Sequence, residues 1–195
     1  MRLLLAKVEH VSRPVCVYHI LTFEKTEGFQ RRPARLVNFV ILMKTKPLKR
    51  HIALQPLSRD HHHGLLLCWK IRKGLQHGVS PERVKAYADW FWEHHLHAHF
   101  IEEEKQIFPL LTTSNALVQQ ALNEHERLRQ LFGHPTADAS ILNHTADDLE
   151  QHIRFEERVL FQEIQRVVSE VILSEININE DDSSSCPIWE DEFWK

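Results

Sequence analysis

Residues 99–109, HFIEEEKQIFP, and residues 152–162, HIRFEERVLFQ, carry the same pattern twice. Aligned without a gap, the two segments agree at their first, fifth, sixth and tenth positions. On a helix, positions i and i+4 lie on one face, so each histidine projects beside the carboxylate that follows it. The repeat therefore predicts two equivalent helices that each present an imidazole and a carboxylate together. The matching residues are His99 and His152, Glu103 and Glu156, Glu104 and Glu157, and Phe108 and Phe161.

Apolar residues accompany both pairs, which indicates that the pairs point inward. His99 shares its stripe with Trp92 and Ile107, and His152 follows Leu149 on the same face. Burying an unpaired carboxylate costs several kcal/mol, and a buried imidazole needs partners for its ring nitrogens. A cation held between the helices would supply the missing partner.

Four helices are expected from the apolar periodicity and from start and stop residues. Gly74 and Gly78 end the first, the Ser80-Pro81-Glu82 start signal opens the second, and Pro109 stops it. Short connections predict an all-α, up-down-up-down four-helix bundle. The expected ranges are 57–75, 81–108, 114–132, and a fourth helix that ends near Leu173 and starts either at a capping box, Thr145-x-x-Asp148, or earlier, near Ala139.

Counting residues from the turns predicts that histidines from all four helices lie at one depth. His61 lies 16 residues before His77, and His99 lies 18 residues after Pro81, which correspond to about 24 and 27 Å. In the second hairpin, His125 lies seven residues before Phe132, which corresponds to about 10 Å. His152 lies seven residues after Thr145, the same distance from the turn if the fourth helix starts there. The predicted metal ligands are His61, His99, Glu103, His125, His152 and Glu156.

This donor set indicates the kind of metal centre. Nitrogen and oxygen donors without a thiolate suit iron or manganese better than structural zinc. Two carboxylates that can bridge favour a dinuclear centre. We therefore expect two iron ions, with manganese or zinc less favoured, and open positions for dioxygen, nitric oxide or peroxide. His62 is an alternative to His61, and Glu157 and Arg129 are candidates for orienting the ligands.

Four segments resemble the hemerythrin-like HHE cation-binding domain family over roughly residues 55–170. They are DHHHGLL, HFIEEEKQIFP, NEHERLR and HIRFEERVLF. The resemblance implies a four-helix bundle around a non-haem di-iron site. Arg129 stands where oxygen carriers place a second histidine on the third helix. On the fourth helix carriers use H-x-x-x-x-D, whereas this chain has Glu156 at the fourth position after His152 and Glu157 at the fifth. The set of four histidines and two glutamates looks more like bacterial di-iron proteins of iron-centre repair and nitric oxide stress.

The composition argues against a nucleic-acid-binding, membrane or disulfide-rich protein. A formal charge of -3 over 195 residues provides no basic field for nucleic acid or an anionic membrane. Cys16, Cys68 and Cys186 form no C-x-x-C pair, which favours a reducing cytoplasm over a disulfide scaffold. The apolar run at residues 37–43 is too short to span a bilayer.

The chain is expected to contain one domain with flanking segments. Residues 1–42 are interpreted as an unstructured or non-native extension, residues 43–56 as a lead-in, residues 57–173 as the bundle, and residues 174–195 as an acidic and aromatic tail. The terminal CPIWEDEFWK either docks on the bundle or stays free. Two functional alternatives remain beside a binding protein: a di-iron peroxidase or oxidase, and a metal-free helical interaction module.

Overall fold

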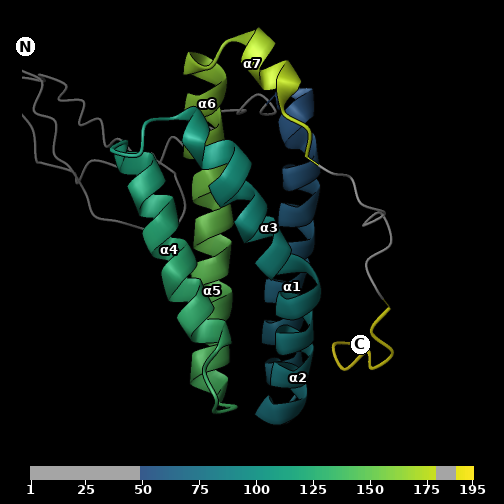
Figure 1. Cartoon of the computed structure of the whole chain (residues 1–195). Coiled ribbons are helices and arrows are strands. Elements are labelled where there is room, and N and C mark those ends of the chain that lie inside the picture. The colour runs from purple at the N-terminus through teal and green to yellow at the C-terminus, as the bar shows by residue number, and fades with distance from the viewer. Residues whose placement is uncertain (1–48, 179–187) are drawn as a thin grey trace, which may run out of the picture. The chain divides into compact units, whose positions relative to one another are not determined.

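The computed structural model describes residues 49–178 and 188–195, and every regular element within these ranges is helical. Four helical segments, each antiparallel to the next, form a bundle (Figure 1), which confirms the predicted all-α fold. The predicted extension at residues 1–42 lies outside the described ranges. The segments are α1 (Gln55–Gln76), α2 (Pro81–Phe91) with α3 (His97–Glu102), α4 (Ala116–Phe132), and α5 (Ala139–Phe155) with α6 (Phe161–Val167).

The second segment is one long helical run with two local changes of winding. α2 begins at Pro81, directly after Ser80, as predicted. Five-residue π-helical stretches follow α2 and α3, and a 3-10 turn ends the run at Leu110. Pro109 lies inside this last turn, so it ends the helix within one turn of the predicted position. The intervening elements are η2 (Trp92–Leu96), η3 (Glu103–Ile107) and η4 (Phe108–Leu110).

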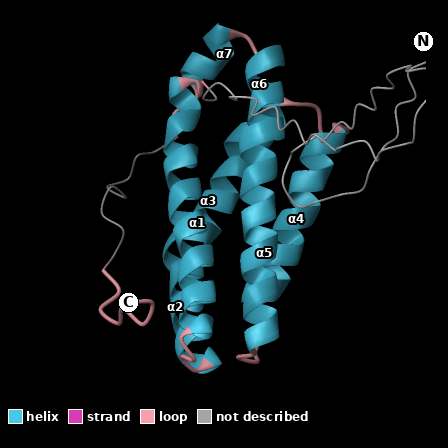
Figure 2. Ribbon diagram, turned by 180° about the vertical axis from the view of Figure 1, so that it is seen from behind, coloured by secondary structure: helices cyan, strands magenta, loops and turns pink. Residues whose placement is uncertain are grey.

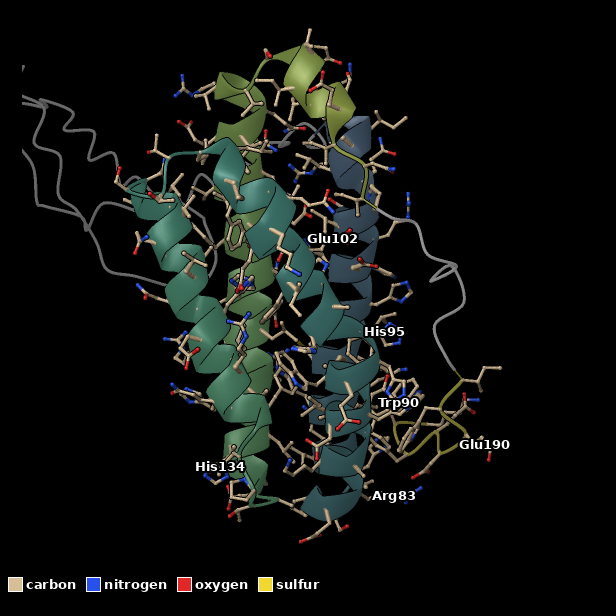
Figure 3. The ribbon with its side chains drawn as sticks, viewed as in Figure 1. Arg83, Trp90, His95, Glu102, His134 and Glu190 are labelled. Atoms are coloured by element: carbon tan, nitrogen blue, oxygen red, sulfur yellow. The ribbon has the colours of Figure 1, made fainter. Side chains whose placement is uncertain are left out.

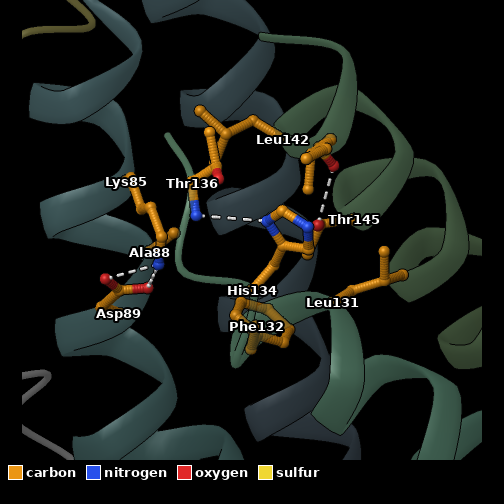
Figure 4. Close-up of a pocket in the computed structure, with 10 residues that line it drawn as sticks. Lys85, Ala88, Asp89, Leu131, Phe132, His134, Thr136, Leu142 and Thr145 are labelled. Carbon is orange, nitrogen blue, oxygen red and sulfur yellow. Dashed lines mark hydrogen bonds and ion pairs between the residues drawn. The ribbon is translucent and has the colours of Figure 1, made fainter. Parts of the chain in front are cut away.

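The fourth segment starts at Ala139, and the predicted capping box at Thr145 is wrong. Asp138 caps the helix, because its side chain accepts hydrogen bonds from the backbone N–H groups of Ser140 and Ile141. Thr145 is buried inside α5, and its hydroxyl donates to the carbonyl of Ile141 at 2.8 Å (Figure 4). A threonine bonded to its own preceding turn is not available to cap a helix.

The fourth segment also ends earlier than the predicted Leu173. A π-helical stretch, η5 (Glu156–Leu160), joins α5 to α6, which stops where Val168 becomes extended. Ser169 then caps a separate short helix, α7 (Glu170–Glu175), by accepting from the backbone N–H of Ile172. From the other side, Figure 2 shows α7 turning from the end of α6 towards α1.

Two apolar clusters fill the bundle, and polar residues separate them. Phe100 and Ile153 belong to one cluster, and Ile107 and Leu160 belong to the other. Along both helices the residues between these positions include the repeated glutamates. None of the helices in the described ranges combines the length and apolar character needed to cross a bilayer.

The aromatic end of the chain docks on α2, which is one of the two alternatives predicted. Phe193 is buried, with 5% of its surface exposed. The rings of Trp189 and Trp194 lie 5.5 and 5.2 Å from that of Tyr87, and the Lys70 ammonium lies 3.8 Å from the centre of the Trp194 ring. Residues 188–195 therefore cover an aromatic surface of the first hairpin (Figure 3).

Candidate metal centre

All four helical segments contribute to one buried polar cluster. Its members are the six residues predicted as ligands, and none has more than 5% of its surface exposed. Histidines from all four helices therefore lie at one depth of the bundle, as the residue counts predicted. The four histidines lie one on each helical segment: His61 on α1, His99 on α3, His125 on α4 and His152 on α5. The two glutamates follow in the π-helical stretches, Glu103 in η3 and Glu156 in η5.

The cluster contains two overlapping groups of possible metal donors. In each group, one donor atom from every residue lies within 4.8 Å of the others. Each group takes both imidazoles from one hairpin, and both groups use the same two carboxylates. The groups are His61, His99, Glu103 and Glu156, and His125, His152, Glu103 and Glu156.

Each shared carboxylate faces imidazoles of both groups. Glu103 places Oε1 3.3 Å from Nε2 of His99 and Oε2 3.4 Å from Nε2 of His125. Its two oxygens thus point to different groups. A carboxylate in this position can bind one ion through each oxygen.

Glu156 lies between the two remaining imidazoles. Its Oε2 is 3.1 Å from Nε2 of His61 and 3.3 Å from Nε2 of His152. The two glutamates come from opposite hairpins, so each hairpin supplies two imidazoles and one shared carboxylate. The arrangement has an approximate two-fold relation that follows the sequence repeat.

The unsatisfied atoms of the cluster test whether a cation fits. Both carboxylate oxygens of Glu103 and Glu156 lack a hydrogen-bond partner, as do the Nε2 atoms of His61 and His99. Buried polar atoms are rarely left in this state, because losing water without a new partner is costly. All of these atoms face the interior of the cluster. The residues therefore fit a group of bound cations.

The outer nitrogen of every cluster imidazole meets a carboxylate. This is the pattern by which proteins fix the orientation and tautomer of metal-binding histidines, leaving Nε2 free to bind. Two of the four carboxylates come from the repeat, and the other two directly precede His61 and His125 in the sequence. The Nδ1 contacts are His61 with Glu157 at 2.8 Å, His99 with Asp60 at 3.3 Å, His125 with Glu104 at 2.7 Å, and His152 with Glu124 at 2.8 Å.

Cationic side chains hold two of these carboxylates in place. Arg129 donates to Glu104 at 2.6 Å, and Arg50 donates to Glu157. Arg129 and Glu157 thus lie beside the cluster, where the sequence suggested a supporting role. His62 is exposed and lies outside the cluster. Sequence reasoning missed Arg50 and the acids preceding His61 and His125, although the acid-histidine dipeptides were visible in the sequence.

A known protein family matches the part of the chain that contains the cluster. The profile of the hemerythrin HHE cation binding domain matches residues 53–164, more than half of the chain. The chain belongs to the hemerythrin HHE family. The match covers all six residues of the cluster in this HHE domain and confirms the resemblance found in the sequence. No curated protein and no solved structure matches the chain significantly.

The two copies of the sequence repeat in the HHE domain also share a local backbone conformation and the placement of a phenylalanine. Both η3 and η5 start at a shared glutamate and have the wide winding of a π-helix, which is frequent at functional sites. Phe108 lies 5.3 Å from the ring of His125, and Phe161 is stacked 5.5 Å from the ring of His61. Each of the four matched sequence positions therefore has an equivalent place in the two hairpins.

Without a metal, the cluster of the HHE domain holds charges that stabilise one another. Burial opposes a charge on His99, but Glu103 and Asp60 outweigh burial and raise the pKa of His99 to about 9. Burial also opposes ionisation of Glu103, and His99, His125 and His61 lower its pKa well below the usual range. A cation binding here would have to displace protons from the imidazoles.

Proposed function

We propose that this HHE domain binds two iron ions and uses them to bind or respond to a small ligand. The observation that carries the proposal is a buried set of four imidazoles and two carboxylates, in which the four carboxylate oxygens and the Nε2 atoms of His61 and His99 lack hydrogen-bond partners. Each ion would receive two imidazoles from one hairpin. Glu103 and Glu156 would serve both ions.

The donor chemistry favours iron. Imidazole and carboxylate suit iron and manganese, whereas structural zinc sites are usually four-coordinate and often contain cysteine. Cys68 is buried in one of the apolar clusters and belongs to neither donor group. Burial raises the pKa of its thiol to about 12, so it stays protonated near neutral pH.

The surroundings of the cluster favour a small ligand. Phe100 stacks on His125 with ring centres 3.8 Å apart, and Phe161 covers His61. These rings exclude water from the imidazoles, and the acids behind them keep Nε2 directed inwards. When bound, the iron ions would supply Lewis acidity and redox capacity towards dioxygen, nitric oxide or peroxide.

Metal content tests this function directly. We expect the full chain, purified without oxygen, to contain about two iron ions and the Glu103→Ala/Glu156→Ala variant to contain few, because the variant lacks both shared carboxylates. His144→Ala is the matched control, since its side chain is exposed and outside the cluster. Near-ultraviolet absorption under air should accompany the iron in the wild-type protein and the control.

Two results would point to the other functions. Less than one metal ion per wild-type chain would favour the metal-free interaction module. Consumption of hydrogen peroxide by the iron-loaded wild-type protein, and not by Glu103→Ala, would favour the peroxidase or oxidase. A binding or sensing protein should instead show a spectral change with the ligand and no sustained turnover.

A further inference from the structure

A surface cavity reaches the outer side of the buried cluster. It has a volume of about 530 Å³ and lies along η2, α3 and the facing part of α1. Figure 3 shows His95 and Glu102, which line it, on the same side of the bundle. Its floor includes His99, one of the six cluster residues. The imidazole and carboxylate side chains that line the cavity are Asp60, His63, His94, His95, His99 and Glu102.

Beside Lys105 and several apolar residues, the lining of this cavity contains side chains that can bind a cation. Imidazole and carboxylate groups are the donors that borderline divalent cations prefer. His94 is exposed, and its Nδ1 donates to the backbone carbonyl of Trp90 at 2.8 Å. That bond leaves the Nε2 lone pair of His94 available to a metal.

Asp60 connects the cavity to the cluster. Its side chain is 38% exposed and lines the cavity, while its Oδ2 lies 3.3 Å from Nδ1 of His99. The next residue in α1, His61, belongs to the cluster. One carboxylate thus lines the cavity and contacts a buried imidazole.

The second hairpin provides an internal comparison, because other residues occupy the positions that match His63 and His95. Arg127 follows His125 by two residues, as His63 follows His61, and Asp148 precedes His152 by four residues, as His95 precedes His99. Arg127 and Asp148 form an ion pair at 2.8 Å. The sequence therefore departs from its own repeat where the cavity lies, and it places imidazoles there.

We propose that this cavity is the uptake site for divalent cations. His63, His94 and Asp60 bind a cation transiently one after another at the surface, and the cation then passes His99 to reach the buried cluster. This inference rests on the proposed metal-binding function. The proposal names the side chains that control the rate at which cations reach the buried cluster and the side from which they enter.

Cobalt(II) uptake by the full metal-free chain tests the route. Cobalt absorbance in a stopped-flow instrument reports the rate, and metal analysis after equilibration reports the stoichiometry. For His63→Ala/His94→Ala we expect uptake several-fold slower than in the wild type, because the variant lacks two of the side chains that first bind the cation. The final stoichiometry and spectrum should equal those of the wild type, because neither residue is in the cluster.

His144→Ala provides the control, since this exposed histidine lies on the second hairpin beside Asp148. It should fill at the wild-type rate, and circular dichroism should show that all variants are folded. Uptake by the double variant within twofold of the wild type would overturn the proposed route alone. A lower final stoichiometry would also overturn it, because the histidines would then be permanent ligands. Absence of cobalt binding by the wild type would overturn the metal-binding function as well.

Discussion

Consecutive glutamates in the repeat have different roles. Neighbouring helical residues point about 100° apart, so the two acids of each pair approach the facing imidazole from different sides. Glu103 faces the cluster interior, and Glu104 turns to His125 on the next hairpin. Glu156 and Glu157 repeat this division. One glutamate in each pair is placed to bind, and the other is placed to orient an imidazole of the opposite hairpin.

The orienting glutamates can be tested separately from the shared ones. Glu104→Ala and Glu157→Ala should each weaken cation binding about 10- to 100-fold, because an imidazole loses the partner that fixes its orientation. Competition with a chelator of known affinity measures the change. Glu126→Ala is the control, since Glu126 is exposed on α4. Unchanged affinity in both variants would contradict the role inferred from the Nδ1 contacts.

The metal-free protein should lose stability as the pH rises. The pKa of His99 is raised from 6.5 to about 9 by its carboxylate neighbours, so its charged form stabilises the fold. This contribution is complete below pH 6.5 and is lost as the pH rises to about 9. Thermal unfolding with a chelator present should show Tm falling across this window.

The metal-loaded protein should respond in the opposite direction. Protons compete with cations for the imidazoles, so cation binding strengthens as the pH rises. The shift in Tm caused by the metal should therefore grow between pH 6.5 and about 9. A metal-free Tm that rises across this window would contradict the charge assignment of His99.

At the scale of the elements, periodicity and turn residues were sufficient to predict four helices and their order. Local signals were less reliable for the ends of the fourth helix. The Thr145 pattern resembles a cap, but whether threonine caps a helix or lies within it depends on the preceding backbone. The break at Val168 likewise carries no Gly or Pro signal. Such boundaries depend on tertiary packing.

The depth of the second pair of histidines was predicted from the wrong helix start. His152 lies 13 residues after Ala139, whereas His125 lies seven before Phe132, a difference of about 9 Å. Their Nε2 atoms are nevertheless 3.0 Å apart. The connection between α4 and α5 makes up the difference, since α5 extends further than α4 at that end of the bundle (Figure 1).

The inward donors were predictable because an i, i+4 pattern places both members of a pair on one face. Their partners were harder to predict, because they depend on how neighbouring helices are rotated. Asp60 contacts His99 and Glu124 contacts His152, each on a different helix of the same hairpin. Arg50, more than 100 residues before Glu157, could be assigned only from the packed structure.

Close packing between α1 and α5 can be tested at Gly64. A Cβ atom there would lie 2.8 Å from the Ile153 side chain. Gly64→Val should lower the free energy of unfolding by about 2 kcal/mol, because the branched side chain overpacks this contact. Urea denaturation of the metal-free protein measures the loss. Ala86→Val at an exposed helical position is the control, and an equal effect at both positions would contradict the close approach.

At the scale of the whole molecule, Gly74 permits the chain end to dock. A Cβ atom at this position would lie 2.6 Å from the ring of Phe193. Gly74→Ala should therefore displace residues 188–195, although alanine favours the helix itself. Tryptophan emission should shift to longer wavelength as Trp189 and Trp194 leave the Tyr87 surface. The metal content should remain that of the wild type.

A double variant separates this clash from other effects of the substitution. Phe193→Ala should lower the free energy of unfolding by about 2 kcal/mol through lost apolar burial. In that background Gly74→Ala should no longer destabilise, because the ring that it meets is absent. Equal effects of Gly74→Ala in both backgrounds would contradict docking through Phe193.

The shared carboxylates have a consequence for the chain as a whole. Each hairpin owns one pair of imidazoles, but both groups need the glutamate of the other hairpin. Two bound cations would act as a removable cross-link between the halves of the chain. Removing the cations would leave the helices of each hairpin intact and weaken the contact between the two hairpins. The hairpins should therefore separate before their helices unfold.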